Sequence, residues 1–163
     1  MLQDSKSGEF LACEVHPVAL EDVESLEPGW YFDWFEQIQQ SETYKLMAID
    51  LPERILGMMS IERRSGYVEV LLVESNPKNI GREKRFRGIP GHLLAFAADL
   101  SFRLGNEGFL RLIAKTELID HYVKEYGFIR HGSSQVMILD TEAADKLISA
   151  FFGGNDDGAI ART

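Results

Sequence analysis

The sequence has 163 residues, which is enough for one domain with a sizeable core and short of the length at which chains usually divide in two. Its composition, with 45% hydrophobic and 26% charged residues, excludes collagen-like, low-complexity and wholly disordered proteins. The formal net charge of -9 repels polyanions, so we expect neither nucleic acid nor a membrane as a main partner.

Targeting signals are not evident in the sequence. The richest apolar run, residues 93–102, is interrupted by Asp99 and is far shorter than the roughly 20 residues that cross a bilayer. The first ten residues lack the basic start and apolar stretch of a secretory signal. A single cysteine, Cys13, cannot form an internal disulfide, and we expect it to be a small buried hydrophobe. These features predict a cytoplasmic protein.

The first half of the chain predicts one strand, two short helices and an antiparallel meander. We expect a flexible stretch over residues 1–9, and the breaker Pro28-Gly29 separates the two helices. Alternation and helical spacing predict strands over residues 10–16, 44–50, 54–63 and 67–74, and helices over 17–26 and 30–40.

The second half predicts alternating helices and strands. Pro90 suits the first turn of a helix, which apolar residues at helical spacing carry to Leu104, and Thr116 is expected to cap a helix that Gly127 ends. The remaining elements are strands over residues 108–115, 128–130 and 135–139, a helix over 141–152, and a disordered tail over 153–163. Residues 10–152 are therefore expected to form a single domain.

Charge is unevenly distributed along the chain. Residues 7–44 contain no Lys or Arg, whereas the segment from Lys78 to Gly88 concentrates five basic side chains against Glu83: Lys78, Arg82, Lys84, Arg85 and Arg87. A solvated basic loop is the plain interpretation of such a run. However, this loop leaves a strand and opens a helix, so free backbone N–H groups and the helix dipole would face an anion there. The segment Arg85-Phe86-Arg87-Gly88-Ile89-Pro90-Gly91-His92 is therefore a candidate phosphate site.

Two motifs in order resemble the Gcn5-related N-acetyltransferases. Arg85-x-x-Gly88-x-Pro90 is similar to the family's pyrophosphate signature, Q/R-x-x-G-x-G/A, and Tyr122-x-x-x-x-Gly127-Phe128 is similar to its closing motif. The resemblance implies the acyl-CoA N-acyltransferase fold, an α/β fold with a mixed, mostly antiparallel central sheet flanked by helices, here with an extra C-terminal helix. Two departures stand out: Pro90 removes an amide, and Lys115 stands where a family Asn contacts the pantetheine arm.

The resemblance implies an enzyme that transfers an acetyl group directly from acetyl-CoA to a primary amine of a small molecule or peptide. It assigns cofactor contacts to Val73 and to the loop residues Arg85, Phe86, Arg87, Gly88, Ile89, Gly91 and His92. A base or a water relay must take the proton of the ammonium, and a carboxylate could do so: Glu69 is the first candidate and Glu74 the second, with water alone a third. Tyr122 would donate to the departing thiolate, whereas Tyr126 is read as core.

The acceptor is less constrained. Aromatic and acidic residues 30–36 would suit a cationic amine, although Trp34 and Phe35 at helical spacing are also typical of core. The four histidines have no metal-ligand spacing, so no metal is expected. A homodimer through the last strands is left open. Two alternatives also stay open: a catalytically silent CoA-binding regulatory module of the same fold, and a protein-interaction domain without a CoA site.

Overall fold

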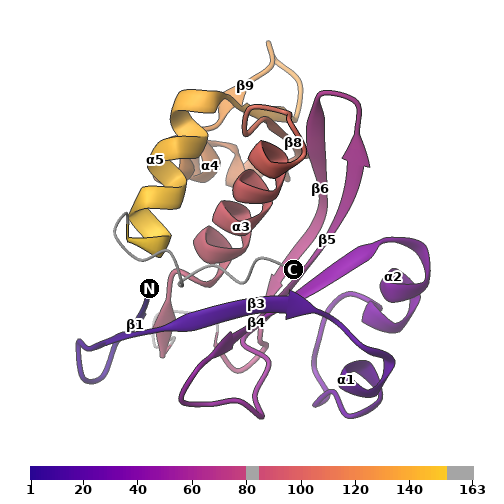
Figure 1. The fold of residues 1–163 in the computed structure, drawn as a ribbon, viewed down its shortest axis with the longest axis vertical. Helices are drawn as coiled ribbons and strands as arrows, with labels where there is room; N and C mark the ends of the chain where they lie inside the picture. Colours follow the sequence, from indigo (N-terminus) through magenta and orange to yellow (C-terminus); the bar gives the residue numbers. More distant parts are fainter. Residues whose placement is uncertain (80–84, 154–163) are drawn as a thin grey trace.

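The computed structural model describes residues 1–79 and 85–153. Figure 1 shows a curved sheet with three helices gathered on one side and two short helices at its far end. In chain order the elements are β1 Leu2–Asp4, β2 Phe10–Leu11, β3 Cys13–Pro17, α1 Leu20–Glu24, α2 Trp34–Gln40, β4 Glu42–Ala48, β5 Gly57–Arg64, β6 Tyr67–Ser75, β7 Phe86–Arg87, α3 Ile89–Arg103, β8 Leu110–Ile113, the 3-10 turn η1 Thr116–Leu118, α4 Ile119–Tyr126, β9 Ile129–Arg130, β10 Val136–Leu139 and α5 Thr141–Phe152.

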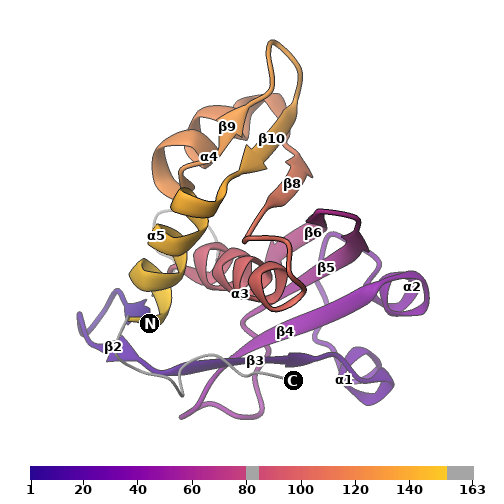
Figure 2. The same ribbon diagram turned by 45° about the horizontal axis from the view of Figure 1, so that its top comes forward.

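The main sheet has seven strands in the order β3-β4-β5-β6-β8-β10-β9. Its neighbours are antiparallel except β6 and β8, which run parallel. This confirms the expected mixed, mostly antiparallel sheet. Figure 2 shows that the sheet opens between β6 and β8, so that its two halves diverge.

Helix α3 carries the core. It packs on β5 and β6, and its residues from Leu93 to Ala98 are fully buried. Because side chains alternate along a strand, Tyr44 and Leu46 of β4 face this core while Lys45 faces the other way. The Lys45 Nζ lies 2.8 Å from Asp22 Oδ1 of α1, which places α1 on the opposite face of the sheet from α3.

The N-terminus differs from the expected flexible stretch. Strand β1 pairs with β2 and with β7, and Leu2 is fully buried. Strands of two or three residues, such as β1, β2 and β7, are too short to show alternation, so the sequence could not reveal this small sheet. The tail residues 154–163 and the basic residues Arg82 and Lys84 lie outside the described residues.

Several elements are shorter than expected. The helices over residues 17–26 and 30–40 shrink to α1 and α2, and α2 begins only after Asp33, whose side chain caps it by accepting from the Glu36 N–H at 3.0 Å. Thr116 does not cap α4: it opens the 3-10 turn η1 instead. Helix α5 has the predicted bounds.

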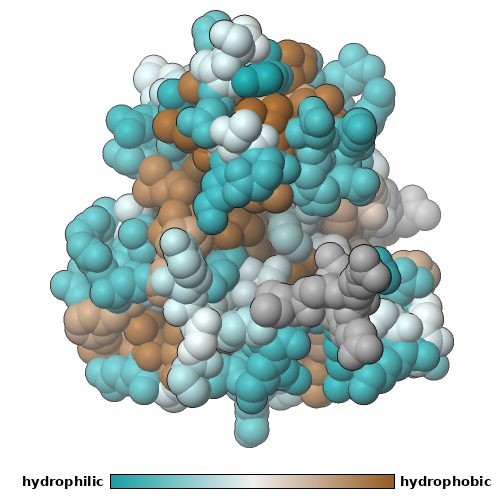
Figure 3. Space-filling model, turned by 180° about the vertical axis from the view of Figure 1, so that it is seen from behind, coloured by the Kyte–Doolittle hydropathy of each residue, from teal (hydrophilic) through white to brown (hydrophobic). Residues whose placement is uncertain are grey.

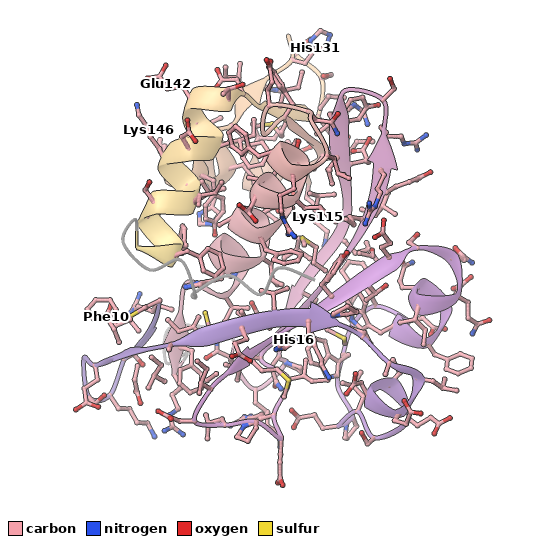
Figure 4. The ribbon with its side chains drawn as sticks, viewed as in Figure 1. Phe10, His16, Lys115, His131, Glu142 and Lys146 are labelled. Carbon is pink, nitrogen blue, oxygen red and sulfur yellow. The ribbon has the colours of Figure 1, made fainter. Side chains whose placement is uncertain are left out.

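Helix α5 is amphipathic. Ala144 and Leu147 are buried against the core, while Glu142 and Lys146 form an exposed ion pair that points outward in Figure 4. The rear face is largely hydrophilic, with hydrophobic residues reaching the surface in its middle, in its upper part and at its lower left (Figure 3). No described helix has the length and apolar character that crossing a membrane requires.

Candidate functional site

The opening between β6 and β8 begins two residues into their parallel pairing. Val68 pairs with Leu110 and Glu69 with Arg111, and no later residue of β6 pairs with β8 in the described chain. Beyond that point β6 continues to Ser75, and β8 pairs only with β10. The two strands therefore leave a wedge whose walls carry unpaired backbone groups, which can bind an extended ligand chain.

A β-bulge lies at the start of this wedge. Ser60 of β5 pairs with Leu72 and the next residue, Ile61, pairs with Val70, so Leu71 is the extra residue on β6. The bulge shifts the alternation, and Val73 returns to the α3 side, where it packs against the core. The Val73 backbone therefore lies on the part of β6 that β8 has left, where the sequence motif expects an amide facing the thioester oxygen.

Glu69 is not free. It is buried, and its Oε1 accepts a hydrogen bond from Nη1 of Arg111, the residue opposite it on β8. This ion pair stands at the closed end of the wedge and joins the two strands just before they part. Arg111 was not singled out by the sequence, because forty-two positions separate the partners and only the parallel register brings them together.

Glu74 holds the segment between the two short helices. Its carboxylate accepts from the Tyr31 N–H at 2.7 Å, the Phe32 N–H at 3.2 Å and the Trp34 Nε1 at 2.8 Å. Three donors on one carboxylate make Glu74 a structural anchor for the aromatic segment. Both carboxylates proposed for proton removal are thus engaged within the protein.

The aromatic segment divides between core and surface. Trp34 is 2% exposed, which confirms its assignment to the core, whereas Phe35 is half exposed and that assignment is wrong. Tyr31 is 79% exposed, and its ring lies 5.4 Å from Lys115 Nζ. Because Glu74 anchors Tyr31 at the end of β6 and Lys115 follows β8, this cation–π contact spans the mouth of the wedge. Figure 4 shows Lys115 near the centre of the molecule.

Tyr122 lies on α4 in an aromatic cluster. Its ring contacts Phe128 and Tyr126 at centroid distances of 5.6 Å and 5.8 Å. Its hydroxyl makes no hydrogen bond within the part of the chain that the structure describes, and burial raises the pKa of Tyr122 above its ordinary value. The hydroxyl therefore stays protonated at neutral pH and is available as a donor. Gly127 ends the helix with φ of +81°, as the motif predicts.

The predicted phosphate loop adopts only part of the expected form. Gly88 is the N-cap of α3 with φ of +98°, a backbone conformation that glycine allows at no steric cost. Arg85 and Arg87 are exposed, but Phe86 and Ile89 are buried in the core. The Phe86 N–H donates to Asn79 Oδ1 at 2.7 Å, so this amide is not available to a ligand.

Two of the loop's cations line a cavity and form ion pairs within the protein. Arg85 and Lys78 line a cavity of about 230 Å³ together with Lys6 and Arg54. Arg85 also lies 3.6 Å from Asp4, and Lys78 forms an ion pair with Glu27 at 2.9 Å. These contacts partly neutralise the charge that the sequence assigned to a phosphate.

The position of His92 does not agree with its predicted contact with a phosphate. The side chain is completely buried, Nδ1 bonds to the Gly88 carbonyl at 2.7 Å, and Nε2 makes no hydrogen bond of normal geometry in the described chain. The ring packs edge-to-face against Phe151 and Phe152 at 5.1 Å and 5.2 Å. Burial lowers the pKa of His92 to about 4, so it is neutral and inside the core at neutral pH.

Phe151 covers the two glycines of the loop. A Cβ placed on Gly91 would lie 2.1 Å from Phe151 Cζ, and one on Gly88 would lie 3.3 Å from Phe151 Cε1. The ring thus occupies the space that the glycines leave open. The unpaired backbone of the wedge between β6 and β8 can bind an extended chain, but Phe151 occupies the first turn of α3, where the resemblance places the pyrophosphate of acetyl-CoA. The sequence predicted the C-terminal helix but not what its last turn covers.

Cys13 and the acidic groups suggest no other centre. Cys13 is 4% exposed, as expected, and burial raises the pKa of its thiol to about 12. Within residues 1–79 and 85–153, no group of His, Cys, Asp or Glu is arranged to hold a metal ion.

Comparison with known proteins identifies the architecture. No protein-family profile and no curated protein matches the sequence. Among solved structures, the KacTA–DNA complex aligns with a TM-score of 0.59 at 15% identity, over 85% of this chain and 99% of that one. A mutant of the toxin AtaT bound to the C-terminus of the antitoxin AtaR gives 0.56 at 14% identity, over 84% and 97%.

An N-acetyltransferase is also among the similar solved structures. PaiA from Thermoplasma acidophilum, in complex with coenzyme A, aligns with a TM-score of 0.55 at 16% identity, over 78% of this chain and 98% of that one. Identities this low establish the fold and leave the activity to be argued from the site. These structural alignments, together with the separation of β6 from β8, confirm the fold that the two sequence motifs imply. The chain has the fold of the Gcn5-related N-acetyltransferases.

Proposed function

We propose that the chain is an acetyl-CoA-dependent N-acetyltransferase that acts on a primary amine of a small molecule or a peptide. The observation that carries the proposal is the wedge that opens on β6 after the Glu69–Arg111 pair, because it combines unpaired backbone of β6 with a bulge at Leu71. Its support from known proteins is the shared fold, which includes an N-acetyltransferase in complex with coenzyme A.

The reaction needs three contributions from the protein. The amine nitrogen bonds to the thioester carbonyl carbon, the carbon–sulfur bond breaks, and one proton leaves the amine while the thiolate gains one. The Val73 amide would stabilise the negative charge on the carbonyl oxygen. The Tyr122 hydroxyl, which is protonated at neutral pH and whose pKa burial raises further, would donate to the thiolate.

Glu69 is the proposed base that removes the proton from the amine. Its carboxylate faces away from α3, on the side of α1 and α2, because it alternates with the core residues Val68 and Val70. Arg111 occupies one of its oxygens, so Glu69 would take the proton through its second oxygen or a water molecule. Glu74 has the weaker claim, since three donors already bind it.

The acceptor is proposed to meet the aromatic segment that Glu74 anchors. Tyr31 offers an exposed ring on the same side of the sheet as Glu69, and acidic residues surround it along the chain. A cationic amine suits both features. Proteins of this fold also occur in complexes with acetyl-methionyl-tRNA and with an antitoxin, so the fold alone does not identify the acceptor. The acceptor has to be inferred from the surface residues of this chain. Its net charge of -9 favours a small or peptidic amine over a nucleic acid.

The test is release of CoA thiol from acetyl-CoA with a panel of amines, preceded by calorimetry of acetyl-CoA binding. Tyr122→Phe removes only the hydroxyl, and we expect kcat to fall about 10²-fold because a positioned acid is lost, with acetyl-CoA affinity unchanged. Tyr126→Phe is the matched control, since it removes a hydroxyl from the same helix and cluster. Equal turnover of Tyr122→Phe and the unaltered protein would exclude the proposed role.

A second candidate has a specific observation in its favour. The ring of Phe151 against Gly88 and Gly91 is what a protein-interaction domain of this fold, without a CoA site, would be free to keep. Absence of both acetyl-CoA binding and turnover would favour this interaction domain over the enzyme, whereas binding without turnover would favour the catalytically silent CoA-binding module.

A further inference from the structure

The two ends of the described chain meet at the first turn of α3. The last turn of α5 presents Phe151, whose ring lies against Gly88 and Gly91. The N-terminal ammonium of Met1 donates to the Phe151 carbonyl, and β1 pairs with β7 immediately before α3. In Figure 1 the N-terminus lies beside the end of α5. Residues more than 140 positions apart thus close over one short loop.

The environment they create is apolar. The ring centroid of Phe151 lies 5.1 Å from that of His92 and 6.3 Å from that of Tyr126. Phe152, which is 5% exposed, also packs against His92. His92 is neutral there, and Pro90 supplies no N–H. The first turn of α3 therefore presents aromatic surface where the loop motif predicts donors.

A phosphate group cannot share this position with the ring. Glycine allows an anion to approach the backbone closely because it has no Cβ, and at Gly91 a single Cβ would already collide with Phe151 at 2.1 Å. A phosphate is larger than a methyl group and strongly hydrated. It reaches this part of the loop only after the ring has left.

We propose that the last turn of α5 is a built-in cover of the cofactor's pyrophosphate site, and that Phe151 must swing away before acetyl-CoA can bind. This inference rests on the proposed function. The apparent dissociation constant then equals the intrinsic one divided by the uncovered fraction, so weakening the cover tightens binding.

The helix is built to let only its end move. Its start is fixed by the Asp140 cap, by the Thr141 hydroxyl bonded to the Glu107 carbonyl at 2.7 Å, and by buried Ala144 and Leu147. Ser149 and Ala150, just before the ring, are exposed. Uncovering therefore costs the contacts of one turn rather than those of the whole helix.

The experiment compares CoA binding by calorimetry in the full chain and in Phe151→Ala. We expect the substitution to tighten binding about tenfold, because it shifts the population toward the uncovered state. Ile148→Ala is the matched control: it also truncates a partly buried apolar side chain of α5, one that packs on the core, and its affinity should stay that of the unaltered protein. Phe151→Leu should shift affinity in the same direction by less.

Hydrogen exchange supplies the second measurement. CoA should speed exchange of the amides of residues 149–153 while protecting those of residues 88–92. Equal affinity of Phe151→Ala and the unaltered protein, with no faster exchange in α5, would show that CoA binds with the ring in place and would overturn the cover alone. No binding by either protein would overturn the proposed function and the cover together.

Discussion

The Glu69–Arg111 pair gives the sharpest test of how the wedge is built. Replacing Glu69 with Gln removes the negative charge and keeps the shape of the side chain. The partner guanidinium then loses its counter-ion at the point where β6 and β8 part. We expect a clear loss of stability, independent of any catalytic role.

The size of the effect follows from burial. Breaking a fully buried pair by removing one partner costs about 3–5 kcal/mol, whereas exposed pairs contribute about 0–1 kcal/mol. The Glu69 side chain is 8% exposed and that of Arg111 is 33% exposed, so water can partly solvate the orphaned cation. An intermediate loss of about 2 kcal/mol is expected, which lowers Tm by about 4–8 °C in a domain of this size.

The assay is urea unfolding followed by circular dichroism, with Glu62→Gln as the control. Glu62 pairs with Arg64 at 3.0 Å, but both side chains are 47% exposed, so its loss should stay below about 1 kcal/mol. The double variant Glu69→Gln with Arg111→Gln should lose less than the sum of the two single variants. A stability loss for Glu69→Gln no larger than for Glu62→Gln would refute the structural role and leave the carboxylate free for chemistry.

Two further predictions concern the first turn of α3. Because the pKa of His92 is about 4 in the folded protein and about 6.5 in the unfolded chain, the unfolded state takes up the proton first, so stability falls as pH drops from 6.5 towards 4. That loss is about 3 kcal/mol, and urea unfolding should show it shrink in His92→Gln; identical pH profiles would contradict the assignment. Gly88→Ala should cost about 1–2 kcal/mol from its φ of +98°, plus a contribution from crowding Phe151. Gly66→Ala, with φ of +89° and open space around it, should show only the loss caused by the backbone conformation. Equal losses of stability for the two variants would contradict a contribution from crowding against Phe151.

Local signals predicted the long elements well. Helical spacing after Pro90 and over residues 141–152 located α3 and α5 within a residue, because α5 buries one continuous face and α3 is apolar along most of its length. The meander β4–β5–β6 followed from alternation and the turn at Gly66. These elements are long enough for their own pattern to determine them.

What the sequence could not predict depends on pairing across the fold. Arg111 becomes a site residue only through its register with Glu69, and Tyr31 only because Glu74 anchors it near Lys115. No periodicity records such contacts, since each joins side chains that are exposed or polar in their own segment. The motifs identified Glu69 and Tyr122 as candidates, but their partners came from the tertiary structure.

Phe151 shows the same limit with more consequence for function. The apolar stripe of α5 predicts that the helix buries Ala144, Leu147 and an aromatic end, but it cannot say which surface receives that end. The glycine loop before α3 predicts a phosphate site on equally local grounds. Both patterns are satisfied at once by the contact of Phe151 with Gly88 and Gly91, since glycines that admit a phosphate also admit an aromatic ring. A loop motif of this kind therefore establishes that the backbone can be approached closely, and the affinity of CoA for the chain with and without Phe151 decides which partner makes that approach.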